Sequence, residues 1–155
     1  MVLIKILKPK YWPKELEDLT RATWKINDLR IIPSCNWIIN RSKEFGYKES
    51  FDNAGMVFPI AASRSDHSWV RKRVLLKNEK GEYKNPHHLS ENNDLIKGWY
   101  VHVGNKRVQY GIENNYDCIM GYIITTPLQR ERVKKYTHIP HTEIPNEDSS
   151  SYYFQ

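Results

Sequence analysis

A short stretch in which apolar and polar residues alternate around a glycine constrains the fold of this chain most strongly. Within residues 97–112, Gly104 and Asn105 have the pattern of a two-residue loop that favours a type II′ turn. Because side chains alternate between the faces of a strand, this turn predicts a β-hairpin with one apolar and one polar face. We expect the apolar face in the core, and it carries Trp99, Val101, Val103, Val108 and Tyr110. We expect the other face to be solvated or to bind a partner, and it carries Tyr100, His102, Arg107 and Gln109.

Apolar periodicity predicts further elements on both sides of this hairpin. Strands are predicted at residues 2–8, 29–32, 56–62, 69–77, 82–84 and 116–126. Asn78 to Gly81 has the pattern of a hairpin loop that ends on a left-handed glycine. Helices are predicted at residues 13–27, 34–46 and 127–136, and a strand at 37–39 competes with the second of them.

Together these elements predict a single α+β domain over residues 1–137. We expect an antiparallel sheet of sequential β-hairpins with two or three helices, and a small β-barrel with appended helices is the alternative. Residues 138–155 lack periodicity and are predicted to form a C-terminal tail. The aromatic end of this tail, Tyr152, Tyr153 and Phe154, would be able to dock on a partner.

The charge of the chain indicates a class of partner. Its formal net charge is +6, and basic residues gather in three clusters, one of which lies beside Tyr100 and His102 on the predicted central hairpin. Cations neutralise phosphates and aromatic rings stack on exposed bases, which favours a small non-catalytic accessory protein that binds RNA, DNA or a nucleoprotein assembly. An acidic protein surface and a merely solvated basic face are the alternatives. The predicted contacts are Arg71, Lys72, Arg73, Lys77, Lys80, Lys84, Tyr100, His102, Lys106, Arg107, Arg130, Arg132, Lys134 and Lys135.

A group of histidines offers a catalytic alternative. The order His87, His88, Asn93, His102 resembles the arrangement in the ββα-metal, HNH-like nucleases. The resemblance implies that His87, His88 and Asn93 would activate and orient a water molecule, and that His88 and His102 would bind the metal. Without this resemblance we expect no enzyme and no cofactor, because the sequence has no glycine-rich phosphate-binding loop.

Other features bear on the compartment and on assembly. Cys35 and Cys118 are far apart in sequence, which favours two free thiols in a reducing compartment over a single disulfide. The chain has no apolar run long enough to cross a membrane and no signal peptide, so we expect a soluble intracellular protein. Its density of Asn, Lys, Tyr and Ile is typical of an AT-rich genome, such as that of a phage or virus, in which case the host cell would be its compartment. A structural subunit held in a larger complex by Trp12, Trp24 and the tail is the third functional hypothesis.

Overall fold

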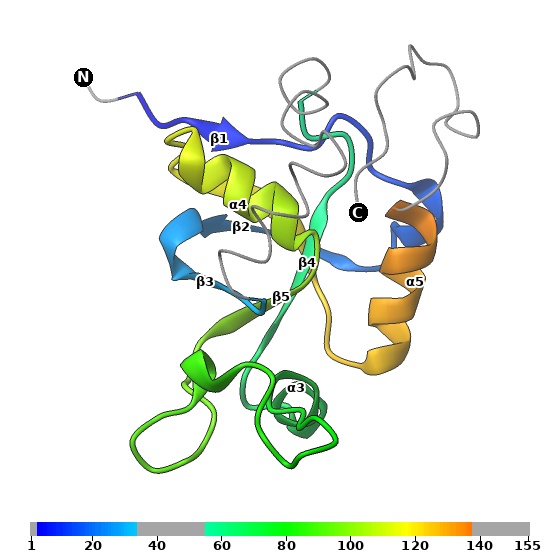
Figure 1. The fold of residues 1–155 in the computed structure, drawn as a ribbon. Helices are drawn as coiled ribbons and strands as arrows, with labels where there is room; N and C mark the ends of the chain where they lie inside the picture. The colour runs from blue at the N-terminus through cyan, green and yellow to red at the C-terminus, as the bar shows by residue number, and fades with distance from the viewer. Residues whose placement is uncertain (1–2, 34–54, 138–155) are drawn as a thin grey trace.

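Within residues 3–33 and 55–137, the protein has a six-stranded sheet with three α-helices packed against it (Figure 1). The computed structural model describes residues 3–33 and 55–137. The strands are β1 (Ile6–Leu7), β2 (Thr20–Lys25), β3 (Leu29–Ile31), β4 (Ile60–Arg64), β5 (Trp99–Val103) and β6 (Cys118–Ile123). The helices are α3 (Ser68–Val74), α4 (Asn105–Glu113) and α5 (Pro127–Thr137), with short 3-10 turns η1 (Lys14–Leu16), η2 (Ile26–Asp28) and η3 (Pro86–His88).

Strand β6 holds the sheet together, because three other strands pair with it. β2 runs antiparallel along its whole length, whereas β1 and β4 run parallel to it. Since β2 occupies one edge of β6, β1 and β4 follow one another along the opposite edge. β5 then pairs antiparallel with β4, and β3 pairs parallel with β5. The α+β class is therefore confirmed, but the sheet is mixed, and the predicted series of antiparallel hairpins is present only in part.

The hairpin predicted around Gly104 is wrong in its second half. β5 is a strand as predicted, but residues after Gly104 form helix α4 and not a returning strand. Gly104 does adopt the positive φ that the turn prediction required, at 92°, but its ψ of 31° directs the chain into a helix. Val108 and Gly111 lie three residues apart and are both buried, which is the spacing of a helix face.

Most of residues 69–77, predicted as a basic strand, belongs to α3 instead, which ends at Val74. Val70 and Val74 are completely buried and lie one helical turn apart. The alternation of Trp69, Arg71 and Arg73 is also compatible with a strand, so the prediction followed the wrong period.

The helix predicted over residues 13–27 is replaced by η1, β2 and η2. Leu16 and Leu19 are buried as that prediction required, but in β2 only alternate residues, Ala22 and Trp24, turn inward. Thr20 and Thr23 are β-branched and favour an extended backbone, and pairing along all of β6 stabilises it.

Several predicted elements are confirmed. β3 and β6 lie within the predicted strands 29–32 and 116–126, and α5 covers the predicted helix 127–136. Residues 56–62 are buried as predicted, although the strand itself starts at Ile60. The turn at Asn78 is present and Gly81 has a φ of +79°, but a single bridge between Lys77 and Tyr83 takes the place of a full hairpin. The predicted helix or strand within 34–46 and the tail 138–155 lie outside the described residues.

The core of the described residues consists of three hydrophobic clusters, and each α-helix packs on a different one. α4 contributes Val108 to the cluster that contains Trp24 and Val101, while α5 contributes Val133 to a second cluster with Val103. Figure 1 shows α4 and α5 on different sides of β4 and β5. α3 packs on a third cluster, which surrounds Tyr100. The surface between α3 and α5 is therefore distinct from the face that α4 covers.

Candidate nucleic-acid interface

Helix α3 carries three consecutive basic residues at the surface. Because Val70 and Val74 turn inward, Arg71 and Lys72 are exposed and Arg73 is half-buried. All three lie in the last turn of the helix, where the negative end of the helix dipole favours cations.

The segment that follows α3 extends this basic surface. Lys77 and Tyr83 form an isolated antiparallel bridge, and the Nζ atom of Lys77 lies 4.9 Å from the centre of the Tyr83 ring. Asn78 holds the loop between them, because its Oδ1 accepts hydrogen bonds from the backbone N–H groups of Lys80 and Glu82 at 2.9 and 3.0 Å. The exposed lysines of this segment are Lys77, Lys80 and Lys84.

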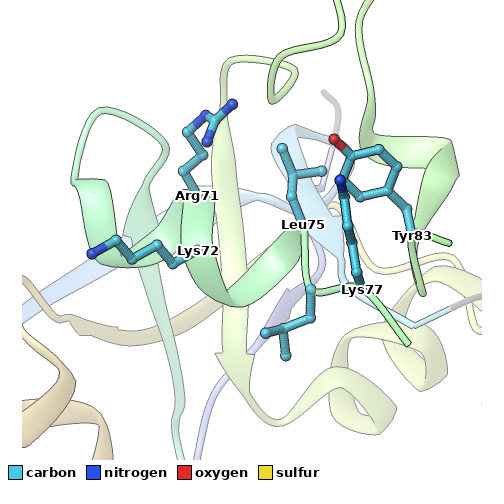
Figure 2. Close-up of a pocket in the computed structure, with 6 residues that line it drawn as sticks. Arg71, Lys72, Leu75, Lys77 and Tyr83 are labelled. Atoms are coloured by element: carbon cyan, nitrogen blue, oxygen red, sulfur yellow. The ribbon is translucent and has the colours of Figure 1, made fainter. Parts of the chain in front are cut away.

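The helix and this segment line an open cavity of about 430 Å³. Figure 2 shows Lys77 extended along the Tyr83 ring with Leu75 next to them, while Lys72 leaves α3 in another direction. The cavity therefore combines an aromatic ring, aliphatic side chains and cations. Its lining residues are Arg71, Lys72, Leu75, Leu76, Lys77 and Tyr83.

A second cavity, of about 330 Å³, lies between α3 and the start of α5. Lys72 and Leu76 line both cavities, so the two adjoin one another across these side chains. The second cavity also contains an aromatic ring and cations. Its lining residues are Trp69, Lys72, Arg73, Leu76, Pro127 and Arg130.

Two carboxylates offset part of this charge. Arg71 donates from Nε to Asp94 at 2.7 Å, and both side chains are largely exposed. The bond holds the pKa of Asp94 below its ordinary value. Arg130 donates to Glu131 at 2.6 Å. Lys72, Arg73 and Lys77 have no ion pair with any described carboxylate, so they carry the excess charge of the two cavities.

Four predicted contacts lie inside the protein instead of on its surface. Tyr100 and Arg107 are completely buried, and His102 and Lys106 are 4% and 8% exposed. Lys106 and Arg107 are buried because α4 replaces the solvated arm of the predicted hairpin and faces the core with its first turns. Tyr100 and His102 lie in β5 and are covered by α3. None of the four side chains is therefore part of the exposed basic surface of α3, although His102 lies beneath that helix and bonds to Arg73.

The remaining basic residues of α5 belong to other surroundings. Arg132 donates two hydrogen bonds to Asp18, at 3.0 and 2.8 Å, and is thereby tied to the segment around η1. Lys134 and Lys135 are exposed on the last turn of α5. Arg130, the first residue of the predicted α5 cluster, lines the second cavity together with α3.

The histidines of the nuclease hypothesis have structural partners. His88 is buried, accepts a hydrogen bond at Nδ1 from Arg30, and donates from Nε2 to the carbonyl oxygens of Ile31 and Ile32. Burial, with a contribution from the neighbouring His87, lowers its pKa to about 4. These bonds attach η3 to the end of β3.

The described residues do not form the metal site that the nuclease hypothesis requires. No group of three or more His, Cys, Asp or Glu side chains within residues 3–33 and 55–137 is placed to hold an ion. Asn93 is exposed with a φ of 59°, and His102 bonds to Arg73. Cys118 is a half-buried free thiol, and Cys35 lies outside the described residues.

Sequence reasoning missed the two aromatic residues that line the cavities. Tyr83 stands beside Lys77 because of the bridge between them, and a two-residue bridge leaves no periodic signal in the sequence. Trp69 donates from Nε1 to the carbonyl oxygen of Thr125, at 2.9 Å, which brings α3 against the segment before α5. A helical interpretation of residues 68–74 would have placed Trp69 and Arg73 one turn apart on the same side.

Comparison with known proteins does not assign a family, because no protein-family model and no curated protein matches the chain. Within the described residues, every helix is too short or too polar to cross a membrane.

Proposed function

We propose that this protein binds nucleic acid without catalysis, through a basic face made of Arg71, Lys72, Lys77, Lys80 and Lys84. The observation that carries the proposal is the cavity beside α3, in which the Tyr83 ring lies among cations that lack enough carboxylate partners. Lysine and arginine neutralise phosphates, and an accessible ring adds stacking energy for an unpaired base. We therefore expect single strands to bind more tightly than duplexes of equal length.

The test measures the affinity of fluorescein-labelled single strands at several salt concentrations. The logarithm of the binding constant should fall linearly with the logarithm of salt concentration, with a slope of about −0.7 for each phosphate neutralised. The double variant Lys72→Gln/Lys77→Gln should bind more weakly and have a slope smaller by about 1.4. Lys134→Gln/Lys135→Gln is the matched control, because it removes the same charge from the last turn of α5.

Two results would overturn the proposal. One is an affinity that stays constant between low and high salt. The other is equal weakening by the α3 and α5 variants, which would mean that only net charge matters. Polyglutamate serves as a competitor for the acidic-protein alternative, because it offers charge but no bases. Competition by polyglutamate at the same charge concentration as a single strand would favour that alternative.

A further inference from the structure

Strand β5 is irregular where it pairs with β4. Ala61 of β4 pairs with Val103 and the next residue, Ala62, pairs with Val101, so β5 has one residue more than β4 at this point. The additional residue is His102. Such β-bulges redirect a side chain and are frequent beside functional sites. The His102 ring packs against Trp69, with ring centres 4.6 Å apart, and so faces α3.

His102 also holds Arg73 in place. Arg73 donates from Nε to Nδ1 of His102 at 3.1 Å. Because an arginine can only donate, Nδ1 must accept, and the ring proton of the neutral imidazole is on Nε2. Burial, together with the charges of Arg73 and Arg130, lowers the pKa of His102 to about 3, so the ring is neutral near pH 7. This bond leaves the two terminal nitrogens of the Arg73 guanidinium for another partner.

Two buried donors lack acceptors among the described residues, one on a residue that lines the cavity between α3 and α5 and one on a residue that contacts this lining. Nε of Arg130 and Nε2 of His102 are buried and find no acceptor among the described residues. Arg73 and Arg130 are close enough that the charge of Arg130, added to burial, lowers the pKa of Arg73 to about 10. The carboxylate bonded to Arg130 is that of Glu131, which is 61% exposed. Buried donors without acceptors are costly, and so are two neighbouring guanidinium charges that share one exposed carboxylate, Glu131. An anion in the cavity would offset both costs.

We propose that the cavity between α3 and the start of α5 binds the terminal phosphate of a nucleic-acid strand, held by Arg73 and Arg130. A terminal phosphate carries close to two negative charges, which matches two guanidinium groups, whereas an internal phosphodiester carries one. Trp69 in the wall of the same cavity is placed to contact the adjoining sugar or base. His102 is a positioning residue, because it acts on the ligand through Arg73. This inference rests on the proposed function for the source of the phosphate.

The experiment compares three labelled single strands of one sequence, with a 5′-phosphate, a 3′-phosphate or two hydroxyl ends. One of the phosphorylated strands should bind about tenfold more tightly than the strand without phosphate, as expected for charge-assisted hydrogen bonds. Arg73→Gln and Arg130→Gln should reduce this ratio to about one. Lys134→Gln is the control for loss of one charge and should keep the ratio.

The positioning role of His102 is tested by the phosphate-dependent affinity ratio, which a purely structural role would not change. His102→Phe keeps a ring against Trp69 but removes the acceptor for Arg73, so it should reduce the phosphate-dependent ratio. His102→Asn restores an acceptor and should recover part of the ratio. If circular dichroism shows that Arg73→Gln does not fold, Arg73→Lys takes its place, because it keeps the charge. Arg73→Lys should also lose most of the phosphate-dependent ratio, since lysine cannot form the bidentate hydrogen bonds of arginine.

The outcomes separate this inference from the proposed function. Equal affinity for all three strands, with the salt dependence intact, would overturn the terminal-phosphate site and leave nucleic-acid binding standing. Adenosine monophosphate and inorganic phosphate serve as competitors for a free small ligand. Arg73-dependent binding of either, without a phosphate effect on strands, would overturn the strand end as the source.

Discussion

Arg107 of α4 donates a hydrogen bond from Nη2 to the carbonyl oxygen of Thr137 at the end of α5, at 3.2 Å. Its Nη1 donates to the carbonyl oxygen of Pro59, just before β4, at 3.1 Å. A fully buried guanidinium therefore joins two helices and a strand. The positive charge is also favourable at the C-terminal end of a helix.

Replacing the Arg107 side chain should lower the free energy of unfolding without changing the ligand preference of the protein. Arg107→Met removes two charge-assisted bonds and leaves buried carbonyl oxygens without donors, which we expect to cost about 2–4 kcal/mol. Urea denaturation measures the loss, and Lys25→Met on the exposed side of β2 is the control. Equal denaturation midpoints for the two variants would show that the Arg107 bonds contribute no stability.

Acid should destabilise the protein through two buried histidines. The pKa values of His102 and His88 are lowered to about 3 and about 4 in the folded state, mainly by burial, against an ordinary value of 6.5. Below pH 6.5 these histidines bind protons in the unfolded chain but not in the folded chain. The free energy of unfolding therefore decreases as the pH falls from 6.5 toward 4. Each group contributes a slope of about 1.4 kcal/mol per pH unit at most.

Urea denaturation at pH 7, 6 and 5 tests this dependence. His102→Gln and His88→Gln should each remove about half of the slope that the pair produces, and the double variant should remove nearly all of it. A slope that survives in the double variant would mean that other groups cause the acid sensitivity.

Two glycines should respond differently to alanine. A Cβ atom on Gly121 in β6 would overlap the backbone carbonyl of Ile60, which cannot move without breaking the pairing of β4 with β6. A Cβ on Gly111 in α4 would meet the ends of the Ile26 and Leu7 side chains, which can rotate. We expect Gly121→Ala to cost about 2–3 kcal/mol, and Gly111→Ala to stay within about 1 kcal/mol because alanine also favours the helix. Thermal denaturation of both variants gives the comparison, and a larger loss for Gly111→Ala would contradict it.

Asn78 should matter more for binding than for stability. Its side chain orders the loop that carries Lys80, through two bonds to backbone N–H groups. Asn78→Ala should reduce the affinity for a single strand by roughly threefold, because binding must then order the loop. The free energy of unfolding should change by less than about 1 kcal/mol, since the loop is exposed. Asn27→Ala, at an exposed position of η2, is the control and should leave both quantities unchanged.

The sequence predicted elements well where only one period fits the residues. β6 is a continuous apolar run with Ile119 and Tyr122 in different clusters, which suits a strand covered on both faces. α5 starts at a proline after Thr126, and the Oγ1 atom of Thr126 accepts a hydrogen bond from the backbone N–H of Gln129. Around Gly104 two structures fit, because a positive φ serves a hairpin turn and a helix start alike. Packing of Gly111 against η2 and β1 decides for the helix, and that contact is not visible in local sequence.

The candidate site was predictable in its exposed charges and not in its geometry. Arg71, Lys72 and Lys77 are conspicuous in the sequence as a run of cations. The position of Arg73 between His102 and Arg130 depends on three elements that are distant in sequence and meet only in the folded sheet. Half-burial of a cation, which is the observation that points to an anion, has no signature in composition.

The pairing of β1, β2 and β4 with a strand that comes much later in the chain has a consequence for how the protein forms. During synthesis these strands cannot complete their backbone hydrogen bonds until β6 has left the ribosome. Most of the stabilising pairs therefore join residues that are far apart in sequence, a topology that folds slowly. Chains that stop before Cys118 should keep at most the pairing of β3 and β4 with β5, so the sheet and the core around it would be completed only in a late step.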